Sequence, residues 1–192
     1  MSRLAETTVP DEVLTQACAG VAQARAAIYA AVAPATLTLI RRIVGERAVA
    51  EDIFQDTMMT LYERLPQFRR EAPLGAWLRQ IAIRGCLMHL RSPWARARQC
   101  LDALEPTALS ERGFTTPCYR AEAIDVERAL ATLRPTARAV LWMYEVEGFS
   151  HAEIAREFGR SVSFSKSQLA RAHARLRAWF EPPEEHHSCT LI

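Results

Sequence analysis

The order of hydrophobic and polar residues predicts a chain built from helices. Over residues 24–44, apolar side chains such as Ile28, Val32 and Ile40 recur every three or four positions. This spacing places them on one face of an α-helix and predicts that they pack in a core. Pro34 lies inside the run, and proline lacks the N–H group that the helical hydrogen-bond ladder needs. The pattern therefore predicts two helical pieces, broken near Pro34.

A helix with two different faces is predicted over residues 48–65. Its inward face comprises Ala50, Ile53, Phe54, Thr57, Leu61 and Leu65. The opposite face, here called the acidic stripe, comprises Asp52, Gln55, Asp56, Met59 and Glu63. Such a stripe is either a solvated face or a docking surface for a basic or mixed partner. The helix dipole favours acids in the first half of a helix, so the pattern alone requires no partner.

A basic loop over residues 68–75 leads into a helix predicted over residues 74–90. Its inward positions are Trp77, Leu78, Ile81, Ala82 and Leu87, and its predicted exposed basic side comprises Arg79, Arg84, His89 and Arg91. Cations beside aromatic rings suit single-stranded nucleic acid, because unstacked bases need rings and phosphates need positive charge. The alternative for Trp77 is a plain role in the core.

Helical periodicity stops over residues 92–120, where Pro93, Pro106 and Pro117 interrupt a polar stretch. This composition is typical of a linker, and the stretch is long for a loop within one domain. Periodicity resumes over residues 121–146. The positions expected to pack there are Val126, Ala129, Leu130 and Leu133, followed after Pro135 by Ala139, Val140, Leu141 and Tyr144.

Residues 149–177 predict two helices joined by a tight turn. Ser150 and Glu153 form the S-x-x-E pattern of a capping box, and Gly159 stands where a left-handed helix end is needed. In the second helix, the positions expected to pack on the first are Val162, Leu169, Ala172 and Leu176, with Ser165 among them.

The other side of this second helix carries hydroxyl, amide and cationic groups. It comprises Ser163, Phe164, Lys166, Ser167, Gln168, Arg171, Arg175 and Arg177, and no acidic residue occurs over residues 160–177. Such groups pair with phosphate oxygens and base edges, and helix-turn-helix proteins place a second helix in the major groove. The alternative to DNA binding is a basic face that contacts only solvent.

Composition adds few constraints. The 192 residues are 49% hydrophobic and carry a net charge of +2, so any nucleic-acid binding must come from local clustering. No run of about eighteen apolar residues and no signal-peptide pattern occurs, which predicts a soluble cytoplasmic protein. The five scattered cysteines predict neither a zinc ribbon nor a disulfide framework. His186, His187 and Cys189 are expected to be unliganded, and no metal, cofactor or catalytic residue is predicted.

Three segments together resemble a known family. AEDIFQDTMMTLYERLPQF, then AWLRQIAIRGCLMHLR, then LRPTARAV through EIAREFGRSVSFSKSQLARAHARLR occur in the order and spacing of bacterial RNA polymerase sigma factors of the extracytoplasmic-function (ECF) group, within the sigma-70 family. The resemblance implies an all-α fold of two small helical domains joined by a flexible linker. The implied parts are an N-terminal extension (1–23), a sigma region 2-like domain (24–91), the linker (92–120), a region 4-like helix-turn-helix domain (121–180) and a tail (181–192).

The resemblance also implies roles for individual residues. Core polymerase would be bound by Asp52, Gln55, Asp56 and Met59. Reading and melting of the single-stranded downstream promoter element would involve Arg69, Arg70, Trp77, Arg79, Arg84, Met88 and Arg91, with a flipped base held by the loop over residues 69–75. The duplex upstream element would be contacted by Ser163, Phe164, Lys166, Ser167, Ala170, Arg171 and Arg175. An anti-sigma factor is a further implied partner, and no small-molecule substrate is implied.

Two departures from the family pattern concern DNA reading. Arg84 and Met88 stand where the family usually has Asn and Asp, so the downstream element is expected to be read either differently or less strictly. Ser163-Phe164-Ser165 replaces a usual Gly-Thr-Val, and Gln168 replaces a common arginine. The predicted function is a sigma factor and not an enzyme. The alternatives are a sigma-like decoy that titrates an anti-sigma factor and a stand-alone helix-turn-helix regulator.

Overall fold

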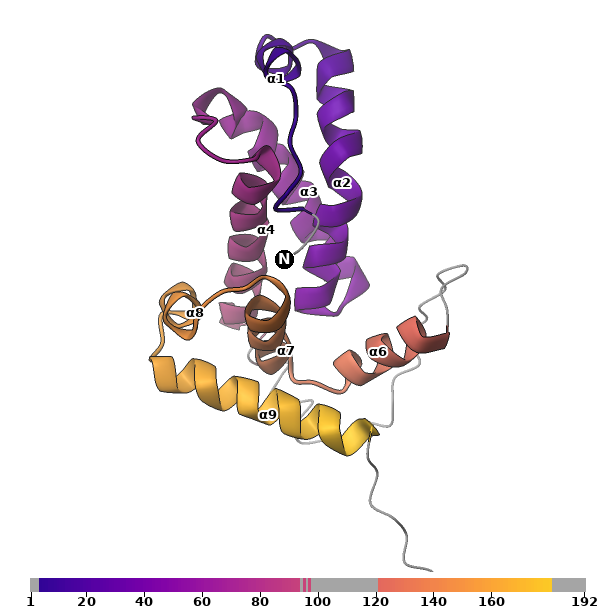
Figure 1. The fold of residues 1–192 in the computed structure, drawn as a ribbon, viewed down its shortest axis with the longest axis vertical. Helices are drawn as coiled ribbons and strands as arrows, with labels where there is room; N and C mark the ends of the chain where they lie inside the picture. Colours follow the sequence, from indigo (N-terminus) through magenta and orange to yellow (C-terminus); the bar gives the residue numbers. More distant parts are fainter. Residues whose placement is uncertain (1–3, 94, 96, 98–120, 181–192) are drawn as a thin grey trace, which may run out of the picture.

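The computed structural model consists of two helical units, and it describes residues 4–93, 95, 97 and 121–180 (Figure 1). The first unit contains α1 (Asp11–Cys18), α2 (Ala22–Val44), α3 (Arg47–Arg64), the 3₁₀ turn Leu65–Gln67 and α4 (Leu74–Arg91). The second contains α6 (Ala121–Ala131), α7 (Pro135–Leu141), the π-helical turn Trp142–Val146, α8 (His151–Phe158) and α9 (Val162–Phe180). No strand occurs in these residues, so the predicted all-α class is confirmed. Most of the predicted linker and the whole tail, with His186, His187 and Cys189, lie outside the described residues.

The predicted helix break at Pro34 is wrong, because α2 continues through it. Pro34 is exposed, and it lies on the side of α2 that faces solvent. The next turn adds side-chain bonds to the helix, since the hydroxyl groups of Thr36 and Thr38 donate to the carbonyls of Val32 and Pro34, each at 2.8 Å. Helices α1, α3 and α4 all pack against α2. Burial of the apolar face offsets the one backbone bond that proline removes.

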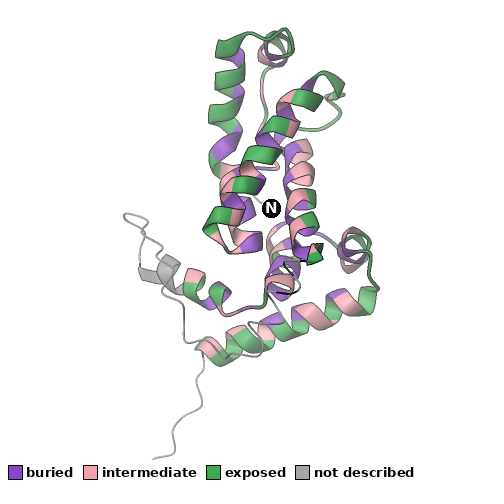
Figure 2. Cartoon of the chain, turned by 180° about the vertical axis from the view of Figure 1, so that it is seen from behind, coloured by how far each residue is buried: buried purple, intermediate pink, exposed green. Residues whose placement is uncertain are grey.

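Helix α2 is also long and apolar enough, by length and composition alone, to cross a membrane. Its place in the fold accounts for that composition. Ile28, Val32, Ile40 and Ile43 are all fully buried and form the centre of the first unit. Figure 2 shows buried residues along the facing sides of these helices and exposed residues along their outer sides.

The predicted inward face of α3 is largely confirmed. Ala50, Ile53, Thr57, Leu61 and Leu65 are buried, and Phe54 is half-buried. Met58 is buried as well, which the helical wheel did not predict. The reason is tertiary: α3 packs against both α2 and α4, so its buried face is wider than a single stripe.

The N-terminal segment packs into the first unit ahead of α1. Leu4 is fully buried, and the Gly75 N–H at the start of α4 donates to the Thr7 carbonyl at 3.0 Å. A Cβ atom added to Gly75 would lie 1.8 Å from the Leu4 carbonyl oxygen. Only glycine therefore permits the chain to cross the start of α4 this closely.

In the second unit, the four predicted helices are present but some inward positions differ. Tyr144, expected inside, is 36% exposed, whereas Met143 is fully buried. The cause is the π-helical turn, in which the Glu147 N–H donates to the Trp142 carbonyl five residues earlier. The wider turn shifts the register relative to an α-helix. Val126 and Val162, also expected to pack, are exposed.

The two described cysteines differ in exposure to solvent. Cys86 is fully inside the first unit, where burial raises its thiol pKa to about 12, whereas Cys18 is exposed on α1. A thiol held neutral in this way does not serve as a nucleophile or metal ligand at physiological pH. Cys86 therefore serves in packing, and the other three cysteines, Cys100, Cys118 and Cys189, lie outside the described residues.

Candidate nucleic-acid interface

The helix-turn-helix has the predicted local geometry. The Ser150 hydroxyl accepts from the Glu153 N–H at 3.2 Å, and the Glu153 carboxylate accepts from the Ser150 N–H at 2.8 Å. Hydrogen bonds from the backbone and side chain of Ser150 hold the pKa of Glu153 below its usual value. Gly159 ends α8 with a φ of 61°. Both turn signals therefore act as the sequence predicted.

The face of α9 predicted to read DNA divides into two groups. Ser163, Lys166, Ala170, Arg171 and Arg175 are exposed. Phe164 instead packs on Phe158, with ring centroids 5.5 Å apart, and the Ser167 hydroxyl donates to the Phe164 carbonyl at 2.9 Å. In this conformation Phe164 and Ser167 therefore contribute contacts within the helix-turn-helix, and Lys166, Arg171 and Arg175 present exposed cationic groups along α9.

A cleft of about 750 Å³ lies between α9 and the turn that joins α6 to α7. Its polar lining consists of Thr132, Arg134, Thr136, Gln168, Arg171 and Arg175. Among the described residues, three guanidinium groups and no carboxylate line it, which suits an anionic ligand such as a phosphate backbone. Arg134 was not predicted as a site residue, because it precedes Pro135 in a turn and no local pattern links it to α9.

On α4, three of the predicted downstream residues share one exposed stripe. Arg84, Met88 and Arg91 are spaced at i, i+4 and i+7, and each is exposed, Met88 to 69%. The Nε of Arg91 donates to the Leu87 carbonyl at 3.2 Å, which leaves the rest of the guanidinium outside. The stripe therefore presents one cation on each side of a flexible apolar side chain, Met88.

The loop before α4 is tied to the first unit through Phe68 and Arg70. Trp77 is half-buried and its ring lies 5.2 Å from that of Phe68, so it contributes to packing as well as to the surface. Arg69 is exposed. Arg70 has a φ of 59° and is tied to α1, donating to the Thr15 hydroxyl at 3.0 Å and pairing with Asp11 at 3.4 Å.

Arg79 does not belong to the exposed basic side of α4, and that part of the prediction is wrong. Its side chain is only 16% exposed, and its Nη1 donates to both the carbonyl and the carboxylate of Glu147, at 3.0 and 3.2 Å. It also lies over the Phe149 ring, 5.0 Å from the centroid. The reason is that α4 meets the second unit here, a contact that sequence periodicity does not encode.

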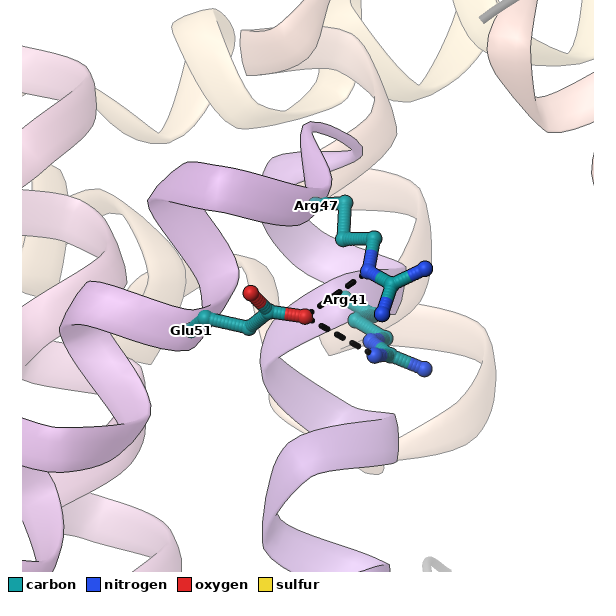
Figure 3. A network of polar contacts seen from close by, with 3 residues as sticks. All are labelled: Arg41, Arg47 and Glu51. Carbon is teal, nitrogen blue, oxygen red and sulfur yellow. Dashed lines mark hydrogen bonds and ion pairs between the residues drawn. The ribbon is translucent and has the colours of Figure 1, made fainter. Parts of the chain in front are cut away.

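The acidic stripe on α3 is exposed as predicted. Its members Asp52, Gln55, Asp56, Met59 and Glu63 all face solvent, Met59 to 60%. The start of α3 is fixed by Glu51, which accepts from Arg47 at 2.8 Å and pairs with Arg41 of α2 at 3.5 Å (Figure 3). The bond from Arg47, with the charge of Arg41 nearby, holds the pKa of Glu51 below its usual value.

No group of three or more His, Cys, Asp or Glu side chains in the described part of the chain is placed to hold a metal ion.

Comparison with known proteins gives matches in both units. The model of Sigma-70 region 2 matches residues 28–96, and that of Sigma-70, region 4 matches residues 123–176. The ECF RNA polymerase sigma factor SigM of Mycobacterium tuberculosis is 34% identical over 127 residues, which cover 66% of this chain and 62% of SigM. The RNA polymerase sigma-E factor of Streptomyces coelicolor is 31% identical over 147 residues, covering 74% of this chain and 78% of that protein.

A solved structure, the sigma factor RpoE in complex with the anti-sigma factor NepR from Bartonella quintana, shares the fold. It has a TM-score of 0.54 and 24% identity, covering 81% of this chain and 95% of that one.

The two helical units, each matched to a different sigma-70 region, define a two-domain protein of the sigma-70 type. Within that class, the chain belongs to the ECF group of RNA polymerase sigma factors.

Proposed function

We propose that the chain is a sigma factor that binds core RNA polymerase and directs promoter recognition, strand melting and the start of transcription. It would act in the cytoplasm as a specificity subunit, without catalysing a reaction itself. The observation that carries the proposal is the separation of three exposed surfaces on one chain. The acidic stripe lies on α3, and two basic surfaces lie on α4 and α9, in different units.

The acidic stripe is the proposed contact with core polymerase, through Asp52, Gln55, Asp56 and Met59. Three of these side chains are polar or charged, and Met59 adds an adaptable apolar group in their midst. A charged rim around a flexible apolar contact is typical of interfaces between separately folded proteins. The Glu51 network holds this helix against α2, so the stripe is presented on a rigid element.

The proposed downstream surface comprises Arg69, Arg70, Trp77, Arg84, Met88 and Arg91, joined by Arg79 when it is released from Glu147. Flipping a base from a duplex costs a few kcal/mol, so this surface must be held in place by the polymerase. Arg84 and Met88 cannot supply the amide and carboxylate that the family usually places there. We therefore propose that they contribute charge and stacking contact instead of base-edge hydrogen bonds.

The proposed upstream surface is the exposed face of α9, with Ser163, Lys166, Ala170, Arg171 and Arg175 in or beside the major groove. Phe164 and Ser167 would stabilise the first turns of α9 where they approach the DNA backbone. The cleft extends this surface, because Arg134 of the neighbouring turn lines it together with Arg171 and Arg175. Phosphate contacts of this kind set the register of the helix on the duplex.

An anti-sigma factor is a further proposed partner. Its support is the likeness in fold to the Bartonella quintana sigma factor, whose structure contains the anti-sigma factor NepR.

The test of this function is run-off transcription with purified core polymerase on a broad promoter library, with permanganate probing for unpaired thymines. Polymerase-dependent melting at specific sites is expected. Absence of melting across the library would reject the proposal. Binding to an anti-sigma factor without melting would then favour the decoy, and duplex binding without polymerase would favour a stand-alone regulator.

The substitution Arg171→Ala is expected to weaken binding to upstream-element duplex by about 1–3 kcal/mol if Arg171 contacts a base, and to relax the preference at one position. Arg134→Ala is expected to weaken binding equally for all sequences, because the cleft contacts phosphate. Fluorescence anisotropy with matched and mismatched duplexes measures both effects. Arg128→Ala, which removes an exposed charge on α6, is the control. An Arg171→Ala affinity equal to that of the control would remove Arg171 from the site.

A further inference from the structure

The two units are joined by a polar contact that the sequence did not predict. Figure 1 shows α7 and α8 against the lower end of the first unit, and α7 packs on the end of α2. At the centre of the contact, Arg138 is 5% exposed. Its Nε donates to the Arg42 carbonyl at 2.7 Å and its Nη2 to the Arg41 carbonyl at 3.3 Å. A cation from α7 therefore caps the carbonyl end of α2, where the helix dipole favours it.

The end of α2 is shaped to accept this guanidinium. Gly45 ends the helix with a φ of 82°, and a Cβ atom there would lie 2.7 Å from Nη1 of Arg138. Burial lowers the pKa of Arg138 to about 10, against the opposing charge of Glu127, so the group remains charged at neutral pH. The charged guanidinium of Arg138 therefore fits closely against the end of α2. A side chain at position 45 would collide with it in this arrangement.

A second contact links α4 to the segment after α7. The fully buried carboxylate of Glu147 accepts from Arg79 at 3.2 Å and from the Trp142 indole N–H at 3.3 Å. Nearby, Arg42 pairs with Glu127 and lies over the Trp142 ring, 5.4 Å from its centroid. In both ion pairs the first unit supplies the arginine and the second unit the glutamate, so the two surfaces are complementary in charge.

Beside the apolar residues that both units bury in one continuous cluster, the contact contains buried and partly buried ion pairs. Contacts between domains are more polar than a domain core, and buried ion pairs are weak sources of net stability because both partners give up hydration. The Nε of Arg79 is buried with no hydrogen-bond partner among the described residues. The closed arrangement therefore leaves one donor of Arg79 unsatisfied, a cost that is relieved when Arg79 meets water or another anion.

We propose that the free protein is held closed by Arg138 on α2 and by the Arg79–Glu147 pair, and that Glu147 masks Arg79 from single-stranded DNA. A guanidinium that is bound to the Glu147 carboxylate cannot also bind a phosphate, so the two anions compete for Arg79. The basic face of α9 stays exposed in the closed form, so duplex binding is not masked. The DNA half of this inference rests on the proposed function, whereas the closed form does not.

The test is Glu147→Gln, which removes the charge but keeps an oxygen for the Trp142 N–H. Small-angle scattering of the free protein is expected to show a larger radius of gyration. Affinity for a labelled oligothymidine of about 15 nucleotides is expected to rise about three- to tenfold at low salt, because one more cation reaches the strand. Affinity for upstream duplex is expected to be unchanged.

Three further variants show whether a change in radius of gyration or in oligothymidine affinity comes from the release of Arg79. Glu12→Gln removes the same charge from an exposed position on α1 and is expected to alter neither measurement. Arg79→Gln is expected to expand the protein without a gain in oligothymidine affinity, because the released cation is gone. Arg138→Met opens the contact by another route and is expected to expand the protein and raise that affinity.

Two results would overturn the proposal: an unchanged radius of gyration in both Glu147→Gln and Arg138→Met, or an equal gain in oligothymidine affinity for Glu147→Gln and Glu12→Gln. These measurements need no polymerase, so they are independent of the transcription test. A Glu147→Gln protein that opens and gains affinity, in a chain that never melts promoters with polymerase, would reject the proposed function and support the closed form.

Discussion

A chain that carries Asp52→Arg together with Asp56→Arg is expected to lose binding to core RNA polymerase while it keeps its fold. Both carboxylates are exposed on α3, one turn apart and on the same side of the helix. Removing one charge from a paired interfacial contact costs about 2–5 kcal/mol, and reversing it adds repulsion. Two reversals at one surface are therefore expected to lower affinity by about a thousandfold or more.

The fold is expected to survive these two changes. Neither carboxylate forms an ion pair among the described residues, and arginine is a good helix former. Both positions also lie beyond the first turn of α3, where the helix dipole acts most strongly on charge. The thermal midpoint, followed by circular dichroism, is therefore expected to change little.

Pull-down and competition against unmodified protein measure the loss. The matched control is Glu6→Arg with Glu12→Arg, which changes the net charge equally at exposed positions outside the stripe. Asp52→Asn with Asp56→Asn is expected to give an intermediate affinity, because it removes attraction without adding repulsion. If the double arginine variant is retained by core polymerase as well as the control, the acidic stripe is not the docking surface.

Gly75→Ala is expected to destabilise the first unit by about 2–4 kcal/mol, although alanine normally favours a helix. The added Cβ would lie 1.8 Å from the Leu4 carbonyl oxygen, so the N-terminal segment must leave the start of α4. Its departure exposes Leu4, worth about 1.5–3 kcal/mol, and breaks the bond from the Gly75 N–H to Thr7, worth about 1 kcal/mol. Chemical denaturation measures the loss.

Two controls separate this clash from a general effect of alanine. At Gly85, in the same helix, the nearest neighbours of a Cβ would be the Ile53 Cγ2 methyl at 3.2 Å and the Thr57 hydroxyl at 4.0 Å, both of them side-chain groups that can shift. Gly85→Ala is therefore expected to be neutral or slightly stabilising. In a chain without residues 1–9, Gly75→Ala is expected to cost nothing relative to its own parent. A cost that persists in the shortened chain would show that the clash is not its cause.

Several features followed from the sequence because their causes are local. The capping box of Ser150 and Glu153 and the left-handed Gly159 involve neighbours within a few residues, so the helix-turn-helix was predictable in detail. The exposure of Asp52 and Asp56 followed from helical periodicity, since a face made almost entirely of charged and polar residues gains little from burial. The all-α class and the two-unit order rest on the same kind of signal.

Other features were decided only when distant segments packed together. The continuity of α2 through Pro34 depends on three helices that bury its other faces, and a local rule predicts the opposite. The cleft that joins Arg134 to Arg171 has no counterpart in the order of residues, because the two positions meet only through the fold.

By itself, the sequence determined the all-α class, the exposed acidic stripe on α3 and the turn chemistry of the second unit. Only the tertiary structure decided that Arg79 faces Glu147 and that Arg138 caps α2. The physical reason is the distance along the chain between the interacting residues. Helix periods and caps act over three or four residues, whereas the partner of a buried charge is whichever group the fold brings within hydrogen-bond distance.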